Sequence, residues 1–405
     1  MPAPSLAQTS YGSIVGTAID ASAATIPGAS VTLTNSRTGD RRVTQSNSDG
    51  AFEFPNLLPG QYRVDVEKTG FKHLTRDNIE VLVQATVRVD LAMQIGDVGQ
   101  TVEVSAQTSL LQTDTSSLGT VVESRKVQEM PLNGRNVINL VTLVPGVVAQ
   151  GQSMTNPTGQ NIFSFGNYQI GGAIAGQNAT FYDGAPLNVA QGSLIALIPT
   201  QDATQEFRVQ TNSLGPEFGR FAGGVINLVS KSGGNSFHGS GYEFLRNKVL
   251  NANTFFNNSS GKPVPAFTQN QYGTNLGGPI KKDKTFFFFA WEGFRLRYGV
   301  PFLVAVPTAQ QRIGDFSNTR SANGALIPIY DPQTNAVGAN GQVTRTQFPN
   351  NIIPLTRLDP TAKILANYWG LPNTTGLPFT NVNNFSANAS AGGNNDEYNT
   401  RIDHN

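Results

Sequence analysis

Apolar and polar side chains alternate at period two through much of this chain, and this alternation constrains the fold more than any other feature. Residues 12–93 and 235–298 both follow it, and turn-forming Gly, Pro, Asn and Asp separate the alternating runs. No run of about eighteen apolar residues occurs, so the sequence encodes no transmembrane helix. Alternating strands still allow a transmembrane barrel, whose side chains face lipid and lumen in turn. The pattern predicts a mostly β protein.

Composition narrows the functions that such a protein can have. The chain holds 28 basic and 27 acidic residues, a balance that argues against binding nucleic acid through a basic face. It has no cysteine, which excludes disulfides, thiol catalysis and Cys-ligated zinc. His73, His238 and His404 lie in different segments, so we expect neither a metal site nor a catalytic histidine. We expect no cofactor and no enzymatic activity.

The first residues are similar to the tail of a secretory signal. Ser5-Leu6-Ala7 fits the small-x-small cleavage pattern, which makes Ala7 the candidate for the last residue removed. We assign residues 1–10 to this remnant. An ordinary disordered N-terminus is the alternative.

Residues 11–94 read as a β-sandwich with hairpin turns at Asp49-Gly50 and Pro59-Gly60. One set of alternating side chains is predicted to fill the core: Phe52, Phe54, Tyr62, Val64 and Val66. The other set is predicted to meet water: Glu53, Arg63, Asp65 and Glu67. The segment resembles the carboxypeptidase regulatory-like domain, a transthyretin-like sandwich grouped with carbohydrate-binding-like folds. It lacks a metal-ligand set and a peptidase constellation, so the resemblance implies no catalysis.

The stretch from Gln205 to Gly239 joins two strand-like runs, 206–210 and 223–231, through a glycine-punctuated turn at 215–219. Upstream, the apolar residues Val137, Leu140, Val141 and Val144 have the spacing of a short helix that Asn133 or Gly134 can start. Further on, Asp183-Gly184 predicts a tight turn in which the aspartate bonds its own following backbone.

The run EFGRFAGGVINLVSKSGGNSFHG at 217–239 resembles the end of the plug domain of TonB-dependent outer-membrane receptors of the Oar-like type, as MPLNGRN and LVPGV resemble its helical entrance. The resemblance implies a plug over residues 123–234. Its motif residues here are Asp183, Gly184, Glu217, Gly219, Arg220, Gly223, Gly224, Asn227 and Lys231. We consider Arg135, Arg208, Glu217 and Arg220 candidates for ion pairs with a barrel wall, the alternative being solvated loop charges.

The linker at residues 95–122 contains a candidate TonB box, the segment that the periplasmic TonB protein grips. The candidate residues are Gln100, Thr101, Val102, Glu103 and Val104. A box must be a short, detachable strand that can add to a partner's sheet edge through main-chain bonds. The alternative is that these residues form the last strand of the sandwich.

Residues 235–405 resemble the start of an Oar-like barrel, with strands near 238–244, 269–280 and 285–298 and a fourth from Glu397. In the third strand we predict that one set of side chains faces lipid: Phe286, Phe288, Phe294, Leu296 and Tyr298. Arg295 and Arg297 are predicted to face the lumen. Glu292 falls on the predicted lipid face, which suggests a bulge there.

The predicted fold is therefore mostly β: a transthyretin-like β-sandwich, an α+β plug domain, and the first strands of an incomplete transmembrane β-barrel. Four strands cannot close a wall of about 22, so we expect an N-terminal fragment of a longer protein. The resemblance implies a receptor in the outer membrane of a Gram-negative bacterium, its N-terminal domain in the periplasm, which takes up a small-molecule, glycan or peptide substrate with TonB. The alternative function is a surface binding or adhesion module that uses the sandwich.

Overall fold

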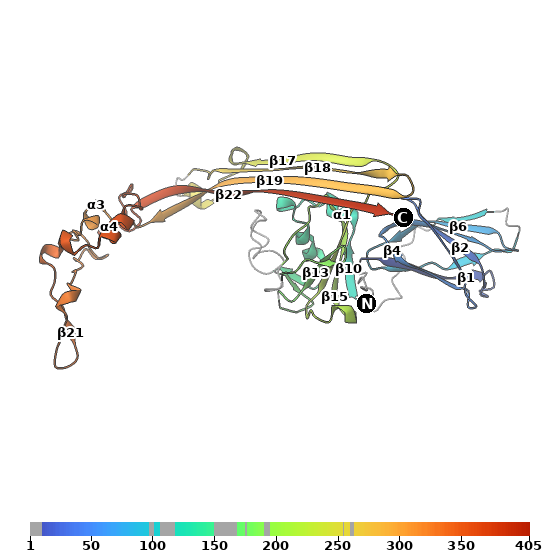
Figure 1. The fold of residues 1–405 in the computed structure, drawn as a ribbon, viewed down its shortest axis with the longest axis horizontal. Coiled ribbons are helices and arrows are strands. Elements are labelled where there is room, and N and C mark those ends of the chain that lie inside the picture. Colours follow the sequence, from blue (N-terminus) through green and yellow to red (C-terminus); the bar gives the residue numbers. More distant parts are fainter. Residues whose placement is uncertain are drawn as a thin grey trace. The chain divides into compact units, whose positions relative to one another are not determined.

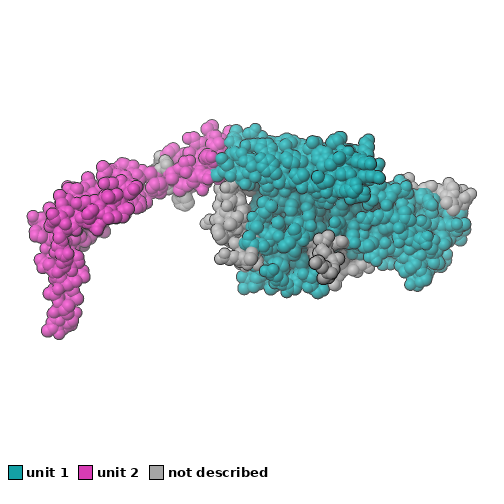
Figure 2. Space-filling model, in the orientation of Figure 1, with its two compact units in different colours: residues 1–245, 270–295, 393–405 teal, residues 246–269, 296–392 magenta. Residues whose placement is uncertain are grey.

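The computed structural model describes residues 10–96, 101–105, 118–149, 168–174, 176–189, 195–253, 255–259 and 263–405. The chain forms two compact units, coloured separately in Figure 2. The first comprises residues 1–245, 270–295 and 393–405, and the second comprises residues 246–269 and 296–392. Among the described residues, no helix has the length and apolar character needed to cross a membrane.

The N-terminal domain, residues 12–105, consists of two β-sheets around one hydrophobic core. One sheet has the order β4-β1-β7, with β8 also paired to β1, and the other has the order β3-β2-β5-β6-β9. The strands are β1 (Gly12–Asp20), β2 (Ser30–Asn35), β3 (Arg41–Gln45), β4 (Ala51–Leu57), β5 (Gly60–Glu67), β6 (His73–Val81), β7 (Thr86–Arg88), β8 (Leu91–Met93) and β9 (Thr101–Ser105).

The alternation identifies the core of this domain correctly, and one of its predicted surface residues wrongly. The predicted core residues are all buried: Phe52, Phe54, Tyr62, Val64 and Val66. Asp65, predicted to meet water, is only 9% exposed. Its carboxylate accepts hydrogen bonds from the Thr75 hydroxyl at 2.8 Å and from Arg63 Nε at 2.9 Å. The adjacent strand β6 thus supplies a donor that lets a charged group remain in the sheet.

The central domain, residues 118–234, is built on a sheet of order β10-β15-β16-β13-β14, with β11 and β12 as a separate pair. Its strands are β10 (Leu118–Val122), β11 (Val147–Ala149), β12 (Tyr168–Ile170), β13 (Ala179–Tyr182), β14 (Ala185–Pro186), β15 (Thr204–Asn212) and β16 (Val225–Ser230). Its helical segments are α1 (Ser124–Glu129) and the 3-10 helices η1 (Asn133–Arg135), η2 (Val137–Leu143) and η4 (Pro216–Phe218).

Helix η2 carries the predicted apolar stripe but begins later than predicted. Val137, Leu140, Val141 and Val144 are at most 3% exposed and form part of the core of this domain. The Asn136 side chain accepts a hydrogen bond from the Ile138 amide at 3.0 Å and so caps the helix. The predicted start at residue 133 or 134 is wrong, because the backbone of residues 134 and 135 has positive φ angles that interrupt a helix.

The C-terminal sheet has the order β17-β18-β19-β22, and Figure 1 shows these four strands side by side. They are β17 (His238–Asn247), β18 (Phe267–Lys281), β19 (Thr285–Val304) and β22 (Phe385–His404). The connections between them, at 248–266, 282–284 and 305–384, follow the predicted order of long, short and long. β19 and β22 extend well beyond their predicted bounds.

The second unit holds the short elements of the two long connections. They are η5 (Lys248–Leu250), α2 (Phe255–Ser259), α3 (Ala309–Arg312), η6 (Pro332–Thr334), β20 (Ala336–Val337), β21 (Val343–Thr344), η7 (Pro349–Asn351), η8 (Leu355–Arg357) and α4 (Pro360–Ala366). The predicted short helix at 360–368 is confirmed by α4, which Asp359 caps. Within this unit Arg357 forms a salt bridge to Asp331 at 2.7 Å.

Candidate functional site

A buried arginine of the central domain is bound by acidic residues from two elements. Arg135 is the last residue of η1, and its Nε donates to Glu292 Oε2 on β19 at 3.1 Å. Its guanidinium also donates to the carboxylate of Asp202, just before β15. The three side chains are only 12–19% exposed. Of the four residues that the sequence suggests for ion pairs with the wall, Arg135 forms one with the C-terminal sheet.

Neutral side chains of the C-terminal sheet complete this cluster, which we call the Arg135 clasp. Glu292 accepts hydrogen bonds from the Tyr242 hydroxyl at 2.7 Å and from Gln271 Nε2 at 2.8 Å. Asn275 Nδ2 donates to Asp202 Oδ1 at 3.3 Å. The Arg135 guanidinium lies 4.2 Å from the centre of the Tyr242 ring, a cation–π distance. Strands β17, β18 and β19 thus all contribute to one polar network.

The clasp fixes which face of β19 meets the central domain, and the predicted assignment is wrong. Phe288 is buried against Ala203 of the central domain, and Glu292 lies on the same face. The even-numbered side chains of β19 therefore point toward the central domain, and no bulge is needed at Glu292. The sequence assigns this face to lipid. This face also contains buried Phe286, Phe294 and Leu296. Alternation separates two faces but does not tell which of two apolar faces is covered by protein.

The opposite face of β19 carries Arg295, which the sequence assigns to the lumen. Its Nη2 donates to both carboxylate oxygens of Asp396 on β22 at 2.8 Å, and its guanidinium lies 5.7 Å from the centre of the Tyr272 ring. The Tyr272 ring in turn packs edge-on against Trp291. The predicted lumen position of Arg295 is therefore wrong. Arg297, in the second unit, donates to the Leu296 carbonyl.

A second polar contact joins β22 to the central domain. Arg401 Nη1 donates to the Ser230 hydroxyl at 3.0 Å and lies 3.6 Å from an Asp183 carboxylate oxygen. The predicted tight turn is confirmed, since Asp183 and Gly184 have φ angles of 48° and 85°. The Asp183 carboxylate, however, accepts from the Ser230 amide at 2.9 Å instead of from its own turn. Nearby, Glu397 accepts from the Thr200 amide at 3.2 Å.

The N-terminal domain contacts the central domain through residues 82–85, which we call the docking turn. Glu206 is 4% exposed and accepts a hydrogen bond from the Val83 amide at 2.6 Å. The pKa of Glu206 is raised to about 7, chiefly by burial. The Val83 amide opposes this increase, and the nearby Glu80 and Glu123 carboxylates contribute to it.

Arg208, an ion-pair candidate, and Asn227, a motif residue, bond to the docking turn. Arg208 donates to the Gln84 carbonyl, and Asn227 Nδ2 donates to Gln84 Oε1 at 2.8 Å. Arg208 therefore bonds to the N-terminal domain, a contact that the sequence does not predict. The sequence gives no sign of this contact, because the partners are more than 120 residues apart.

The remaining motif residues fall into a packed group and an exposed group. A Cβ on Gly223 would lie 2.3 Å from Asn178 Oδ1, and one on Gly224 would lie 2.1 Å from Ile170 Cγ2, so only glycine fits. Glu217, Gly219 and Arg220 are exposed. Neither Glu217 nor Arg220 forms a salt bridge with a described residue, which favours the alternative of solvated loop charges. Lys231, half-buried, follows β16 directly.

The candidate TonB box lies at a sheet edge. Residues 101–105 form β9, which runs parallel to β6 in a register from His73↔Thr101 to Asp77↔Ser105. This is the alternative that the sequence leaves open, a last strand of the N-terminal sheet. Gln100 and the cleavage candidate Ala7 lie outside the described residues. The part of the chain that the structure describes contains no group of three or more His, Cys, Asp or Glu able to hold a metal ion.

Comparison with known proteins supplies the family context of these contacts. Residues 13–94 match the carboxypeptidase regulatory-like domain, and residues 229–405 match an outer membrane beta barrel domain. The chain is 27% identical over 299 residues to the TonB-dependent transporter Oar of Myxococcus xanthus. The matched span covers 70% of this chain and 27% of that protein. The chain is a homologue of Oar. It spans about a quarter of the length of this curated relative.

Solved structures of other outer-membrane proteins resemble parts of this Oar homologue. The outer membrane transporter YddB from Escherichia coli is 20% identical, with 46% of this chain and 27% of that chain covered and a TM-score of 0.35. The siderophore receptor PirA from Acinetobacter baumannii is 17% identical, with 52% and 28% covered and a TM-score of 0.33. The barrel-domain match and the Oar homology assign the protein to the outer membrane of a Gram-negative bacterium.

Proposed function

We propose that this protein is a receptor that imports a substrate across the outer membrane with energy supplied through TonB. In this proposal the central domain is a plug, and β17, β18, β19 and β22 are the first strands of the barrel wall around it. The N-terminal domain lies in the periplasm as a transthyretin-like sandwich. The substrate is a small molecule, glycan or peptide that first meets the outer loops.

The observation that carries the proposal is the Arg135 clasp. It joins the central domain to three strands of the C-terminal sheet through charged and hydrogen-bonded groups, while the apolar cluster beside it consists, among the described residues, of Ala203, Phe288 and Ala290. Water can replace polar contacts when two surfaces separate, whereas an extended apolar interface exposes surface at a cost that grows with its area. A plug that must leave its wall and return is expected to have this kind of interface.

The path by which force reaches the plug follows from chain order. β9 is an edge strand and precedes β10, which is itself the edge strand of the central sheet, paired antiparallel to β15. If TonB captures β9 by main-chain pairing, tension passes along the chain to β10. Detaching β10 would loosen the plug from one side of its sheet before the clasp at Arg135 opens.

In vivo photocrosslinking tests the proposal at β9. A photoreactive amino acid at Val102 is expected to crosslink to TonB in cells that express the protein in the outer membrane. The matched control is Val43, which is 65% exposed on β3, the opposite edge strand of the same sheet. TonB adducts at Val43 but none at Val102 would exclude β9 as the TonB box, and an absence of TonB adducts throughout the N-terminal domain and linker would count against TonB coupling.

A further inference from the structure

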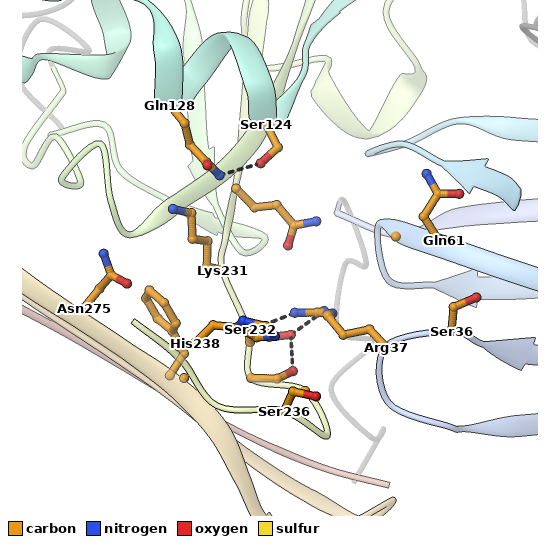
Figure 3. Close-up of a pocket in the computed structure, with 16 residues that line it drawn as sticks. Ser36, Arg37, Gln61, Ser124, Gln128, Lys231, Ser232, Ser236, His238 and Asn275 are labelled. Atoms are coloured by element: carbon orange, nitrogen blue, oxygen red, sulfur yellow. Dashed lines mark hydrogen bonds between the residues drawn. The ribbon is translucent and has the colours of Figure 1, made fainter. Parts of the chain in front are cut away.

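A hollow of about 510 Å³ lies within the first unit, where the N-terminal domain, the central domain and the C-terminal sheet meet. Figure 3 shows its polar side chains: Arg37 enters from the N-terminal domain, Lys231 from the segment after β16, and His238 and Asn275 from the C-terminal sheet. Gln61, Gln128 and Gln205 add amide groups to the lining. The clasp residues Arg135 and Glu292 do not line it.

The ionisable side chains that line the hollow are all basic. Arg37, Lys231 and His238 are its ionisable residues, and no Asp or Glu is among the described residues that line it. Arg37 Nη1 donates to the Ser232 carbonyl at 2.5 Å and Arg37 Nη2 donates to the Ser232 hydroxyl at 2.7 Å, and both acceptors are neutral. Neither Arg37 nor Lys231 forms a salt bridge within the described part of the chain.

Both cations are held away from water without a dedicated counter-charge. Burial lowers the pKa of Arg37 and that of Lys231, because each charged form loses hydration. Arg401 lowers the pKa of Arg37 further, whereas the Asp403 carboxylate, which Arg401 already binds, raises it. The Asp202 carboxylate raises the pKa of Lys231, but Asp202 is already bound by Arg135 and Asn275. Two partly desolvated cations that line one hollow are unfavourable unless an anion enters.

We propose that this hollow is a binding site for a small oxyanion of the phosphate class, held between the Arg37 guanidinium and the Lys231 ammonium. A guanidinium binds two phosphate oxygens in a fork, and an ammonium provides a compact positive charge opposite. Because Arg37 belongs to the N-terminal domain and Lys231 to the central domain, a bound oxyanion links the two domains. The site concerns neither the transported substrate nor TonB, and it stands independently of the transport proposal.

Thermal unfolding of the purified protein in detergent tests the site with inorganic phosphate. Phosphate is expected to raise the unfolding midpoint in a saturable way, beyond the effect of chloride at equal ionic strength. Lys231→Met should weaken phosphate binding at least roughly tenfold, as the loss of a charge-assisted contact implies. The control Lys282→Met removes an exposed lysine from the turn between β18 and β19 and should leave the phosphate response unchanged.

A second readout separates a binding lysine from a structural one. Without phosphate, Lys231→Met should be at least as stable as the wild type, because it removes an uncompensated charge. If the lysine were needed for packing, its replacement would instead lower the stability of the protein. Arg37→Lys keeps the charge but loses the fork and should bind phosphate with intermediate affinity. Equal phosphate responses in wild type and Lys231→Met would overturn the proposal, as would a wild-type response no larger than that to chloride.

The oxyanion has two sources, which a parallel arm distinguishes. Vesicles of phosphatidylglycerol are compared with vesicles of phosphatidylcholine and with free phosphate. A Lys231-dependent response to free phosphate supports a soluble ligand, and a Lys231-dependent response to phosphatidylglycerol alone supports a lipid headgroup. A response to any of these that is independent of Lys231 contradicts the site.

Discussion

The Arg135 clasp predicts a large coupling energy between two residues that lie 157 positions apart in the chain. Arg135 and Glu292 are 14% and 12% exposed and their charged atoms lie 3.1 Å apart, so solvent screens the pair only weakly. Removing one partner of a buried pair costs about 3–5 kcal/mol, because the other charge is left without compensation. Arg135→Met should show this full cost, since it removes the cation that both Asp202 and Glu292 bind.

A double-mutant cycle measures the coupling. Arg135→Met, Glu292→Met and the double variant are compared in urea, with proteolysis of residues 118–234 reporting release of the central domain. The single changes should each destabilise, and the double variant should be less destabilised than their sum by about 2 kcal/mol or more. The control cycle uses Arg125 and Glu129, an exposed pair at 82% and 65%, for which about 0.5 kcal/mol is expected. If the two cycles give the same small coupling, the clasp does not hold the central domain.

Three single substitutions test other contacts. Burial raises the pKa of Glu206 from its usual 4.5 to about 7, so its contribution to docking is full below pH 4.5 and declines by up to about 3 kcal/mol as the pH rises through 7. Hydrogen exchange in the docking turn should therefore speed up from pH 5 to pH 8, after correction for intrinsic rates, in the wild type but not in Glu206→Gln. Gly224→Ala should destabilise the central domain by about 1–3 kcal/mol, since the new methyl overlaps a neighbouring side chain. Gly219→Ala should cost less, because the nearest atom to its new methyl, the Pro216 carbonyl oxygen, is 3.3 Å away. Phe288→Ala should weaken retention of the central domain by about 3 kcal/mol. Phe287→Ala, on the opposite face of β19, should have no such effect. A larger loss from Phe287→Ala than from Phe288→Ala would restore the lipid-facing assignment of Phe288.

Local patterns in the sequence predict the strands well. The core of the N-terminal domain, the turn at Asp183-Gly184 and the stripe of η2 each depend on neighbours within a few residues, which periodicity and turn preference record. The run at residues 217–239, which resembles the end of a plug, includes two closely packed glycines. Gly223 and Gly224 in that run are packed so closely that no other residue fits.

Contacts between distant segments are what the sequence does not predict. Asp65 is buried because Thr75, on the next strand, donates to it, and a single strand pattern carries no information about that neighbour. The face of β19 is misassigned because both of its faces are rich in aromatic residues, so hydrophobicity alone does not say which one meets the central domain. Arg401 contacts Ser230 across 171 positions and has no local motif that marks it.

The central claim is that residues 118–234 are a plug seated against the inner face of the wall. Cysteines at Asp202 and Asn275, whose side chains lie 3.3 Å apart, test it directly because residues 1–405 contain no other cysteine. In isolated outer membranes, mild oxidation should join the Asp202→Cys and Asn275→Cys positions, detected as a linked peptide by mass spectrometry. The control pair combines Asp202→Cys with Leu276→Cys, one residue along β18 on the opposite face, and should remain unlinked. Equal yields from both pairs, or no link from either, would contradict the account.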